Sequence, residues 1–145
     1  MRLKVKIKFE NYEEIIEKMS SIQADGNKAL AKSITRGLLF IETNCKKKVQ
    51  DKISKGRQYG KQIASKPGYP PNTDTGFLAG QMHVRLEPDG LTGHFVSGAW
   101  YSSFLEYGTV NMEARPFVYP AFAEELPGIL KDFQETARKE IIKGA

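Results

Sequence analysis

The two histidines, His83 and His94, are the residues whose type could bind a metal ion or transfer protons near neutral pH. A metal site needs three or four ligands at fixed spacing, and two histidines on a pair of strands do not supply them. Such a pair more often consists of surface neighbours. The sequence therefore predicts no metal site, and a metal-dependent hydrolase that uses both histidines is kept as an alternative.

The other patterns that would carry catalysis are missing from the sequence. It contains no nucleophile elbow and no zincin helix, and Gly56, Gly60 and Gly68 have the wrong spacing for a loop that cradles phosphate. The single cysteine, Cys45, excludes an intrachain disulfide and lies on the apolar face of a predicted helix, where we expect a buried thiol. The sequence predicts no catalytic residue and no cofactor, so an enzyme is not expected.

Lys46, Lys47 and Lys48 form a basic run in a chain whose net charge is +5. The helix dipole favours lysine near a helix C-terminus, which explains the run without any ligand. The same side chains could contact a phosphate backbone. Because no recognition helix or aromatic platform accompanies them, we expect at most non-specific contact with DNA. A small basic DNA-binding protein is therefore the alternative function.

Two stretches of apolar residues at helical spacing predict the long helices that form the scaffold of the protein. Between Asn27 and Ile53 an apolar residue recurs every three or four positions, which predicts one long amphipathic helix. A similar stripe runs from Tyr119 to Ile142, where Pro127 is expected to kink the helix or divide it in two. A short helix from Asn11 through Met19 is also predicted, because Asn11 is a favourable cap.

The predicted first strand and the loop after the long helix are both basic. Residues 2–9 alternate apolar side chains with Lys4, Lys6 and Lys8, which is typical of a strand with one buried face. Residues 55–75 show no periodicity and contain glycines and prolines that break helices. Long loops of this kind in a small domain are often functional, so we interpret this one as a flexible basic arm.

A β-hairpin is predicted over residues 81–98, because Glu87-Pro88-Asp89-Gly90 is favourable for a tight turn. The register that we expect places His83 beside His94 on one face of the hairpin. Together these elements predict a single α+β domain over residues 1–145. In it, the long helix packs on a small, mostly antiparallel sheet, and the C-terminal helix lies alongside. No apolar run is long enough to cross a bilayer, so no membrane contact is expected.

Three sequence blocks, in order, carry a resemblance to a known family. They are Pro67-Gly68-Tyr69-Pro70-Pro71 with Asp74-Thr75-Gly76-Phe77-Leu78, then Tyr101 through Leu105-Glu106-Tyr107-Gly108-Thr109, and finally Ala114-Arg115-Pro116-Phe117 with Pro120-Ala121. On these blocks the chain resembles the HK97 gp10-like family of bacteriophage tail components. It departs from the family at Gln81, where serine is common, and at Gly80, where a bulkier residue is usual.

The resemblance implies a virion structural protein of the head–tail joining region, a tail completion or neck component. Such a protein acts by protein–protein assembly in a ring, with other phage neck and tail proteins as partners. It resides in the virion after assembly in the cytoplasm of the host bacterium, whether the genome is a free phage or a prophage. The positions that it marks as a structural motif are Gly76, Leu78, Glu106, Gly108, Thr109, Arg115, Pro116 and Phe117.

Physical chemistry gives these motif positions a role in the scaffold. Gly76 and Gly108 can adopt backbone angles that are closed to other residues. The aromatic segment 99–107 is expected to form a helical turn that ends at Gly108. Glu106 and Arg115 could form a charged, hydrogen-bonded pair that ties this turn to the segment before the last helix.

Assembly into a ring requires one patch of the protein to meet a different patch of the next copy. We expect these patches on the first strand, the basic arm and the aromatic turn. Tryptophan and tyrosine combine a large apolar body with a polar tip and are common at interfaces. The candidate interface residues are Lys4, Lys6, Lys8, Arg57, Tyr59, Lys61, Trp100, Tyr101 and Tyr107.

Overall fold

A computed structural model describes residues 3–7 and 24–143 of the chain. The predicted helix from Asn11 through Met19 lies outside the described residues. The elements in chain order are β1 (Leu3–Ile7), α2 (Ala24–Gln50), β2 (Gln58–Tyr59), β3 (Gln62–Ile63), α3 (Phe77–Gly80), β4 (Met82–Leu86), β5 (Gly93–Ser97), α4 (Ser102–Tyr107) and α5 (Val118–Lys143).

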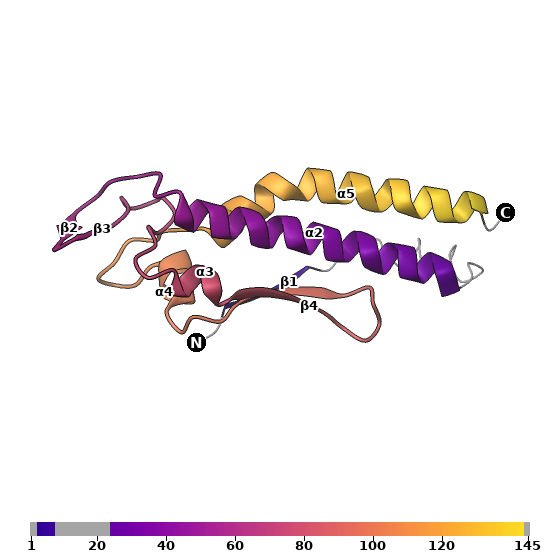
Figure 1. The fold of residues 1–145 in the computed structure, drawn as a ribbon, viewed down its shortest axis with the longest axis horizontal. Coiled ribbons are helices and arrows are strands. Elements are labelled where there is room, and N and C mark those ends of the chain that lie inside the picture. Colours follow the sequence, from indigo (N-terminus) through magenta and orange to yellow (C-terminus); the bar gives the residue numbers. More distant parts are fainter. Residues whose placement is uncertain (1–2, 8–23, 144–145) are drawn as a thin grey trace.

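The two long helices and the sheet form the body of the molecule. α2 and α5 lie side by side and run in opposite directions, and α2 lies between α5 and the sheet (Figure 1). α3, α4 and the β2–β3 hairpin gather at the end of the body where α2 finishes (Figure 1). This arrangement confirms the predicted α+β fold with a long helix on a small antiparallel sheet and a C-terminal helix alongside.

The apolar stripe of α2 faces the core along the whole helix. Its buried members are Leu30, Ile34, Leu38, Ile41, Cys45 and Val49. The predicted last member of the stripe, Ile53, is instead exposed, because α2 ends at Gln50 and Lys52 adopts a left-handed conformation with φ of 48°. Burial of the stripe against the sheet and α5 is the main source of stability in the body.

α2 and α5 approach each other closely because one contact position is a glycine. A Cβ atom at Gly37 would lie 2.7 Å from Cγ2 of Ile129, so a larger residue would push the helices apart. Nearby, the Asp132 carboxylate accepts hydrogen bonds from Ser33 Oγ at 2.6 Å and from Arg36 at 2.8 Å. Contacts of this kind hold the two helices in register.

α5 is a single helix that continues through Pro127. Of the two outcomes expected at this proline, division of the helix is therefore wrong, and a kink stays a prediction. Ala121 before it and Ile129 after it are both buried in the same core, so packing on both sides holds the two parts in one helix. Pro127 itself is exposed, as suits a residue that leaves one backbone carbonyl without its helical donor.

The sheet has the order β1-β5-β4, with both pairs antiparallel. The observed register of the hairpin pairs His83 with Val96 and His94 with Arg85, so the expected pairing of the two histidines was wrong. The reason is a longer connection: the Asp89 carboxylate accepts hydrogen bonds from the backbone N–H groups of Leu91 and Thr92. The turn therefore runs on to residue 92 and moves the register by two residues.

Candidate functional site

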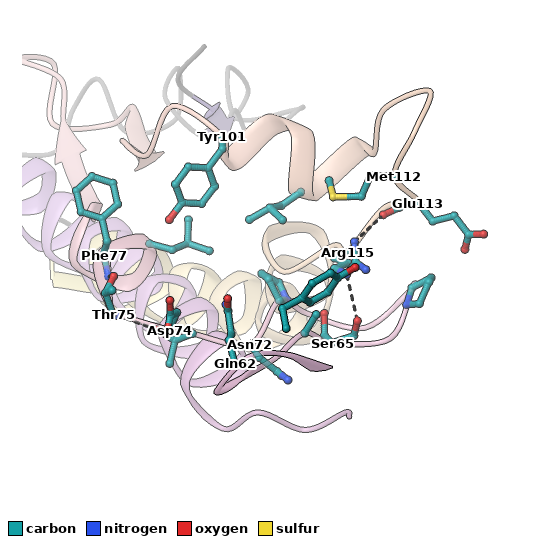
Figure 2. Close-up of a pocket in the computed structure, with 18 of the residues that line it drawn as sticks. Gln62, Ser65, Asn72, Asp74, Thr75, Phe77, Tyr101, Met112, Glu113 and Arg115 are labelled. Atoms are coloured by element: carbon teal, nitrogen blue, oxygen red, sulfur yellow. Dashed lines mark hydrogen bonds between the residues drawn. The ribbon is translucent and has the colours of Figure 1, made fainter. Parts of the chain in front are cut away.

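An open groove of about 740 Å³ lies at the end of the body where α2 finishes. All three sequence blocks that carry the family resemblance contribute to its lining (Figure 2). The first block supplies residues 71–78 with Pro67, the second supplies Tyr101 and Leu105, and the third supplies Arg115. Segments that are far apart in the sequence therefore form one surface feature.

One wall of the groove is the segment that returns from the β2–β3 hairpin, and polar side chains hold it in place. The amide nitrogen of Asn72 donates to the carbonyl oxygens of Ser54 at 2.8 Å and Ile63 at 2.9 Å. The Ser54 hydroxyl accepts a hydrogen bond from the backbone N–H of Lys66. Residues 55–75 are thus tied at their base, and they contain a short hairpin where the sequence showed no periodicity. Their flexibility stays a prediction.

Gly76 forms the corner where this wall turns into α3. Its φ of 80° lies in the left-handed region, and its N–H donates to the Thr73 hydroxyl at 3.0 Å. Two residues later Leu78 is buried and anchors α3 in the core, which leaves Phe77 half exposed at the groove. The predicted conformational role of Gly76 is confirmed.

Phe77 and Tyr101 line the groove, and the rings of Trp100 and Phe104 continue the cluster beyond it. We call these four residues the aromatic edge. The Trp100 ring packs edge-on against both Tyr101, at 5.4 Å between centroids, and Phe104, at 6.3 Å. Trp100 is 65% exposed, which is a large apolar surface to leave in water. Figure 2 shows Tyr101 across the groove from Asn72 and Asp74. The exposed aromatic edge is typical of a protein–protein contact surface.

Glu106, at the end of α4, is buried and holds the start of α5. Its carboxylate accepts three backbone hydrogen bonds, from Phe117 at 2.9 Å, Val118 at 3.0 Å and Tyr119 at 2.8 Å. The first N–H groups of a helix have no partner within the helix, and a negative charge there also interacts favourably with the helix dipole. Glu106 therefore joins α4 to α5 as a long-range helix cap.

The predicted pair between Glu106 and Arg115 is wrong. The guanidinium of Arg115 turns the other way and donates from Nε to the carbonyl of Ser65 at 3.3 Å and from Nη1 to the carbonyl of Glu113 at 3.5 Å (Figure 2). The backbone N–H of Arg115 donates to the carbonyl of Leu105 at 2.6 Å. Arg115 thus connects the third block to the wall of the groove. The carboxylate of Glu106 instead accepts hydrogen bonds from the backbone N–H groups at the start of α5.

The second block closes at Gly108, whose φ is 76°. A Cβ atom there would lie 2.8 Å from the carbonyl oxygen of Met112, so the tight return between Thr109 and Met112 requires glycine. The N–H of Gly68 donates to the carbonyl of Ala114, which fastens the proline-rich loop to the same return. These contacts give Gly108 and the surrounding motif the scaffold role that the sequence predicted.

The free charges in the groove are acidic. The side chains of Asp74 and Glu113 are exposed, and neither has a hydrogen-bond or ion-pair partner among the residues that the structure describes. Arg115, the cation of the lining, is already engaged by two carbonyls. The buried Oδ1 of Asn72 also lacks a donor among these residues. In a chain with a net charge of +5, the groove is thus a local site of unsatisfied acceptors.

The β2–β3 hairpin beside the groove has the opposite character. Arg57 lies over the ring of Tyr59 at 5.4 Å from its centroid, and Lys61 at the tip is exposed. Tyr59 is 58% exposed. The predicted interface residues Arg57, Tyr59 and Lys61 therefore lie on one projecting element, and Trp100 and Tyr101 lie on the aromatic edge.

Of the other predicted interface residues, only the side chains of Lys4 and Tyr107 can be placed. Lys4 is exposed on β1, whereas the side chain of Lys6 and all of Lys8 lie outside the described residues. Tyr107 is 74% exposed and borders a separate apolar hollow, whose other lining residues are Leu3, Glu106, Pro116, Val118, Tyr119 and Phe122.

The basic run at the end of α2 is largely neutralised by acids of the same chain. Lys46 Nζ lies 2.5 Å from Glu42 Oε1, and Lys48 Nζ lies 2.7 Å from Glu124 Oε1. Lys47 is exposed. Two of the three candidate DNA contacts thus already have a carboxylate partner, which supports their interpretation as an ion-paired helix end.

Neither the histidines nor the cysteine contributes to the groove. His94 Nε2 lies 2.5 Å from Glu87 Oε1, and among the described residues no group of His, Cys, Asp and Glu has the geometry of a metal site. Cys45 is buried as predicted, and burial raises the pKa of its thiol to about 12. In the part of the chain that is described, no helix has the length and apolar character to span a membrane.

Sequence reasoning missed several polar residues that build the groove. Asn72, Ser54 and Ser65 act through hydrogen bonds to backbone groups that are remote in sequence, and no spacing rule reveals such partners. Asp74 lies within the first recognised block and Glu113 directly precedes the third, and only Asp74 is distant from basic residues in the sequence. Comparisons with known proteins add no further guide: no family model, no curated protein and no solved structure matches the chain.

Proposed function

We propose that the chain is a bacteriophage virion structural protein of the head–tail joining region, a tail completion or neck component that acts by protein–protein assembly in a ring. The observation that carries this proposal is the convergence of the three sequence blocks on one groove. Blocks that resemble a family of tail components would be expected to meet in space if they serve one shared contact. The same blocks contain the glycines with positive φ, Gly76 and Gly108, and the buried helix cap Glu106.

The surface of the groove supports assembly as the activity. Exposed aromatic rings beside acceptors without donors are the ingredients of a protein–protein contact with an apolar centre and polar rim. We further propose that the chain is not an enzyme. In this proposal its partners are other neck and tail proteins, and it is found in the virion after assembly in the host cytoplasm.

Genetic complementation tests this function. The gene is deleted from the phage or prophage that carries it, and the chain is supplied from a plasmid. We expect the deletion to leave filled heads and separate tails with loss of infectivity, and the supplied chain to restore joined particles. Negative-stain imaging and plaque counts measure both effects. Joined, infectious particles without the protein would contradict the proposal.

A matched pair of variants locates the contact. Trp100→Ala on the aromatic edge should reduce complementation strongly, because interface aromatics often contribute about 2 kcal/mol or more to binding. Phe40→Ala, which removes a similarly exposed ring (57%) from the outer face of α2, should complement normally. Equal complementation by both variants would place the contact elsewhere.

The alternative function, non-specific DNA binding, makes a different prediction about the isolated chain. A small basic DNA-binding protein would bind duplex DNA with an affinity that falls steeply as salt concentration rises. We expect weak binding instead, because Lys46 and Lys48 are paired with carboxylates. Tight, salt-sensitive binding that Lys47→Ala weakens would favour the alternative.

A further inference from the structure

We propose that the groove of one copy holds the β2–β3 hairpin of a second copy. This inference rests on the proposed function, because it names the contact through which copies would join in a ring. The groove has carboxylates without cationic partners among the described residues, and the hairpin has exposed cations, so the two features of the chain are complementary.

The groove requires hydrogen-bond donors and positive charge from its occupant. The carboxylates of Asp74 and Glu113 are exposed and have no hydrogen-bond or ion-pair partner among the described residues. The guanidinium of Arg115 keeps its charge while it donates to the carbonyls of Ser65 and Glu113, so the charged side chains of the lining carry a net charge of −1. An acidic occupant would meet repulsion, whereas a basic one would find carboxylate acceptors.

The groove also offers an apolar surface that water covers poorly. Phe77 is 50% exposed, and Tyr101 and Leu105 line the same side. An occupant that carries charge alone would leave this surface exposed. The best occupant therefore combines basic groups with an aromatic or aliphatic side chain.

The β2–β3 hairpin has this combination. Arg57 and Lys61 are exposed and basic, and Tyr59 and Ile63 expose 58% and 38% of their surface. The hairpin projects beyond the body at the end of the molecule, where a second copy can reach it (Figure 1). Arg57 is already stacked on Tyr59, so a cation and a ring would enter the groove as one unit.

A two-stranded hairpin with exposed strands is marginally stable alone, and contact with a second copy would supply the missing packing. In its own chain, Tyr59 lines the groove together with Gln62 and is still 58% exposed. The cations of the hairpin, Arg57 and Lys61, are not lining residues of the groove, so a contact in which they enter the groove of a second copy is heterologous. Repeated contacts of this type close into a ring when the rotation allows it. The charge complementarity favours a second copy over an unrelated segment.

Cross-linking between two single-substitution variants tests the occupant. A Lys61→Cys chain is mixed with a Thr75→Cys chain under mild oxidation, so a disulfide between these positions can form only between copies. The native Cys45 does not compete, because it is buried. We expect a heterodimeric cross-link on a non-reducing gel. The control pair replaces Lys61→Cys with Lys139→Cys, an exposed lysine on α5 far along the body, and should give little product.

Charge reversal provides the second measurement. Asp74→Lys should weaken self-association by at least about tenfold in light scattering or sedimentation, and Lys61→Glu in the partner chain should restore part of it. Glu135→Lys, which makes the same charge change on an exposed site of α5, should leave association within about twofold.

The outcomes separate this inference from the proposed function. A specific cross-link with charge-swap rescue supports the hairpin as occupant. A chain that stays monomeric at its highest soluble concentration, or that associates without the cross-link, contradicts it. If complementation still depends on Trp100 in that case, the neck function stands and a different protein fills the groove. If the cross-link forms but the deleted phage assembles normally, the contact stands and the function fails.

Discussion

The body of the molecule and its groove end are held together by different kinds of contact. In the body, formed by α2, α5 and the sheet, stability comes from apolar side chains such as Ile41 and Phe95, both fully buried. At the groove end, formed by residues 54–77 and 101–117, polar side chains that bind backbone groups far away in sequence act together with the buried Phe117. The body is thus specified by periodic patterns, and the groove end by individual residues whose partners emerge only in the fold.

The largest effect should come from the core of the body. Phe95→Ala should lower the free energy of unfolding by about 3–5 kcal/mol, because it removes a fully buried ring from the central strand. Tyr107→Ala removes a ring that is 74% exposed and should change it by less than about 0.5 kcal/mol. Urea denaturation followed by circular dichroism measures both. Similar costs for the two variants would remove the distinction between body and surface.

The buried cap should give the next largest effect. Glu106→Ala leaves three backbone N–H groups without their acceptor and should cost about 3 kcal/mol. Glu106→Gln keeps one oxygen acceptor and should cost less. Because Arg115 does not touch this carboxylate, a double-mutant cycle of Glu106→Ala with Arg115→Ala should show coupling below about 0.5 kcal/mol. Strong coupling would restore the paired arrangement that the sequence suggested.

A smaller and more local effect is expected at the groove wall. Asn72→Ala removes the hydrogen bonds to the carbonyls of Ser54 and Ile63 and should cost about 1–2 kcal/mol. Hydrogen exchange should speed up in the β2–β3 hairpin while the amides of α2 stay protected. Asn111→Ala, at an exposed position of the same groove, serves as the control. Uniformly faster exchange would show that the wall and the body unfold as one unit.

The smallest effect concerns acid stability at the contact between α2 and α5. The hydrogen bond from Ser33, followed by that from Arg36, holds the pKa of Asp132 below its ordinary value. Its contribution is therefore present above the unfolded pKa of about 4 and is lost as pH falls through the lower folded pKa. Because the side chains of Arg36 and Asp132 are about half exposed, this contribution should stay below about 1 kcal/mol.

Denaturation at pH 7 and pH 3 measures the change with pH. Asp132→Asn should reduce the loss of stability on acidification, whereas Glu135→Gln, an exposed acid on the same helix, should leave that loss unchanged. A larger acid effect in the Asp132→Asn chain than in the parent would contradict the assignment.

The elements of the body could be predicted from the sequence because each depends on a repeating pattern. The stripe from Leu30 to Val49 identified α2, and the alternation of lysine with apolar residues identified β1. Local turn chemistry was a weaker guide. Glu87–Gly90 marked a turn correctly, but the additional hydrogen bonds of Asp89 extended it and moved the register of β4 on β5.

The groove end could be located from the sequence, but its contacts could not be derived. The three blocks named Gly76, Glu106 and Arg115 as structural, and all three have structural roles. The partners were wrong for Glu106, because the sequence does not show that the first N–H groups of α5 would arrive beside this carboxylate. The sequence suggested the nearby cation Arg115 as the partner of Glu106. The actual partners are the N–H groups at the start of α5, which have no acceptor within the helix.

The position of β5 at the centre of the sheet has a consequence for the order in which the chain can fold. β1 pairs with β5 across a separation of about ninety residues, and the stripe of α2 is covered by α5 only after the last quarter of the chain exists. Such non-local contacts make folding slow, since long loops must close before the contacts stabilise them. During synthesis on the ribosome, the side of α2 that packs against α5 would remain exposed until synthesis is nearly complete. A chain truncated before Val118 should therefore aggregate or recruit chaperones.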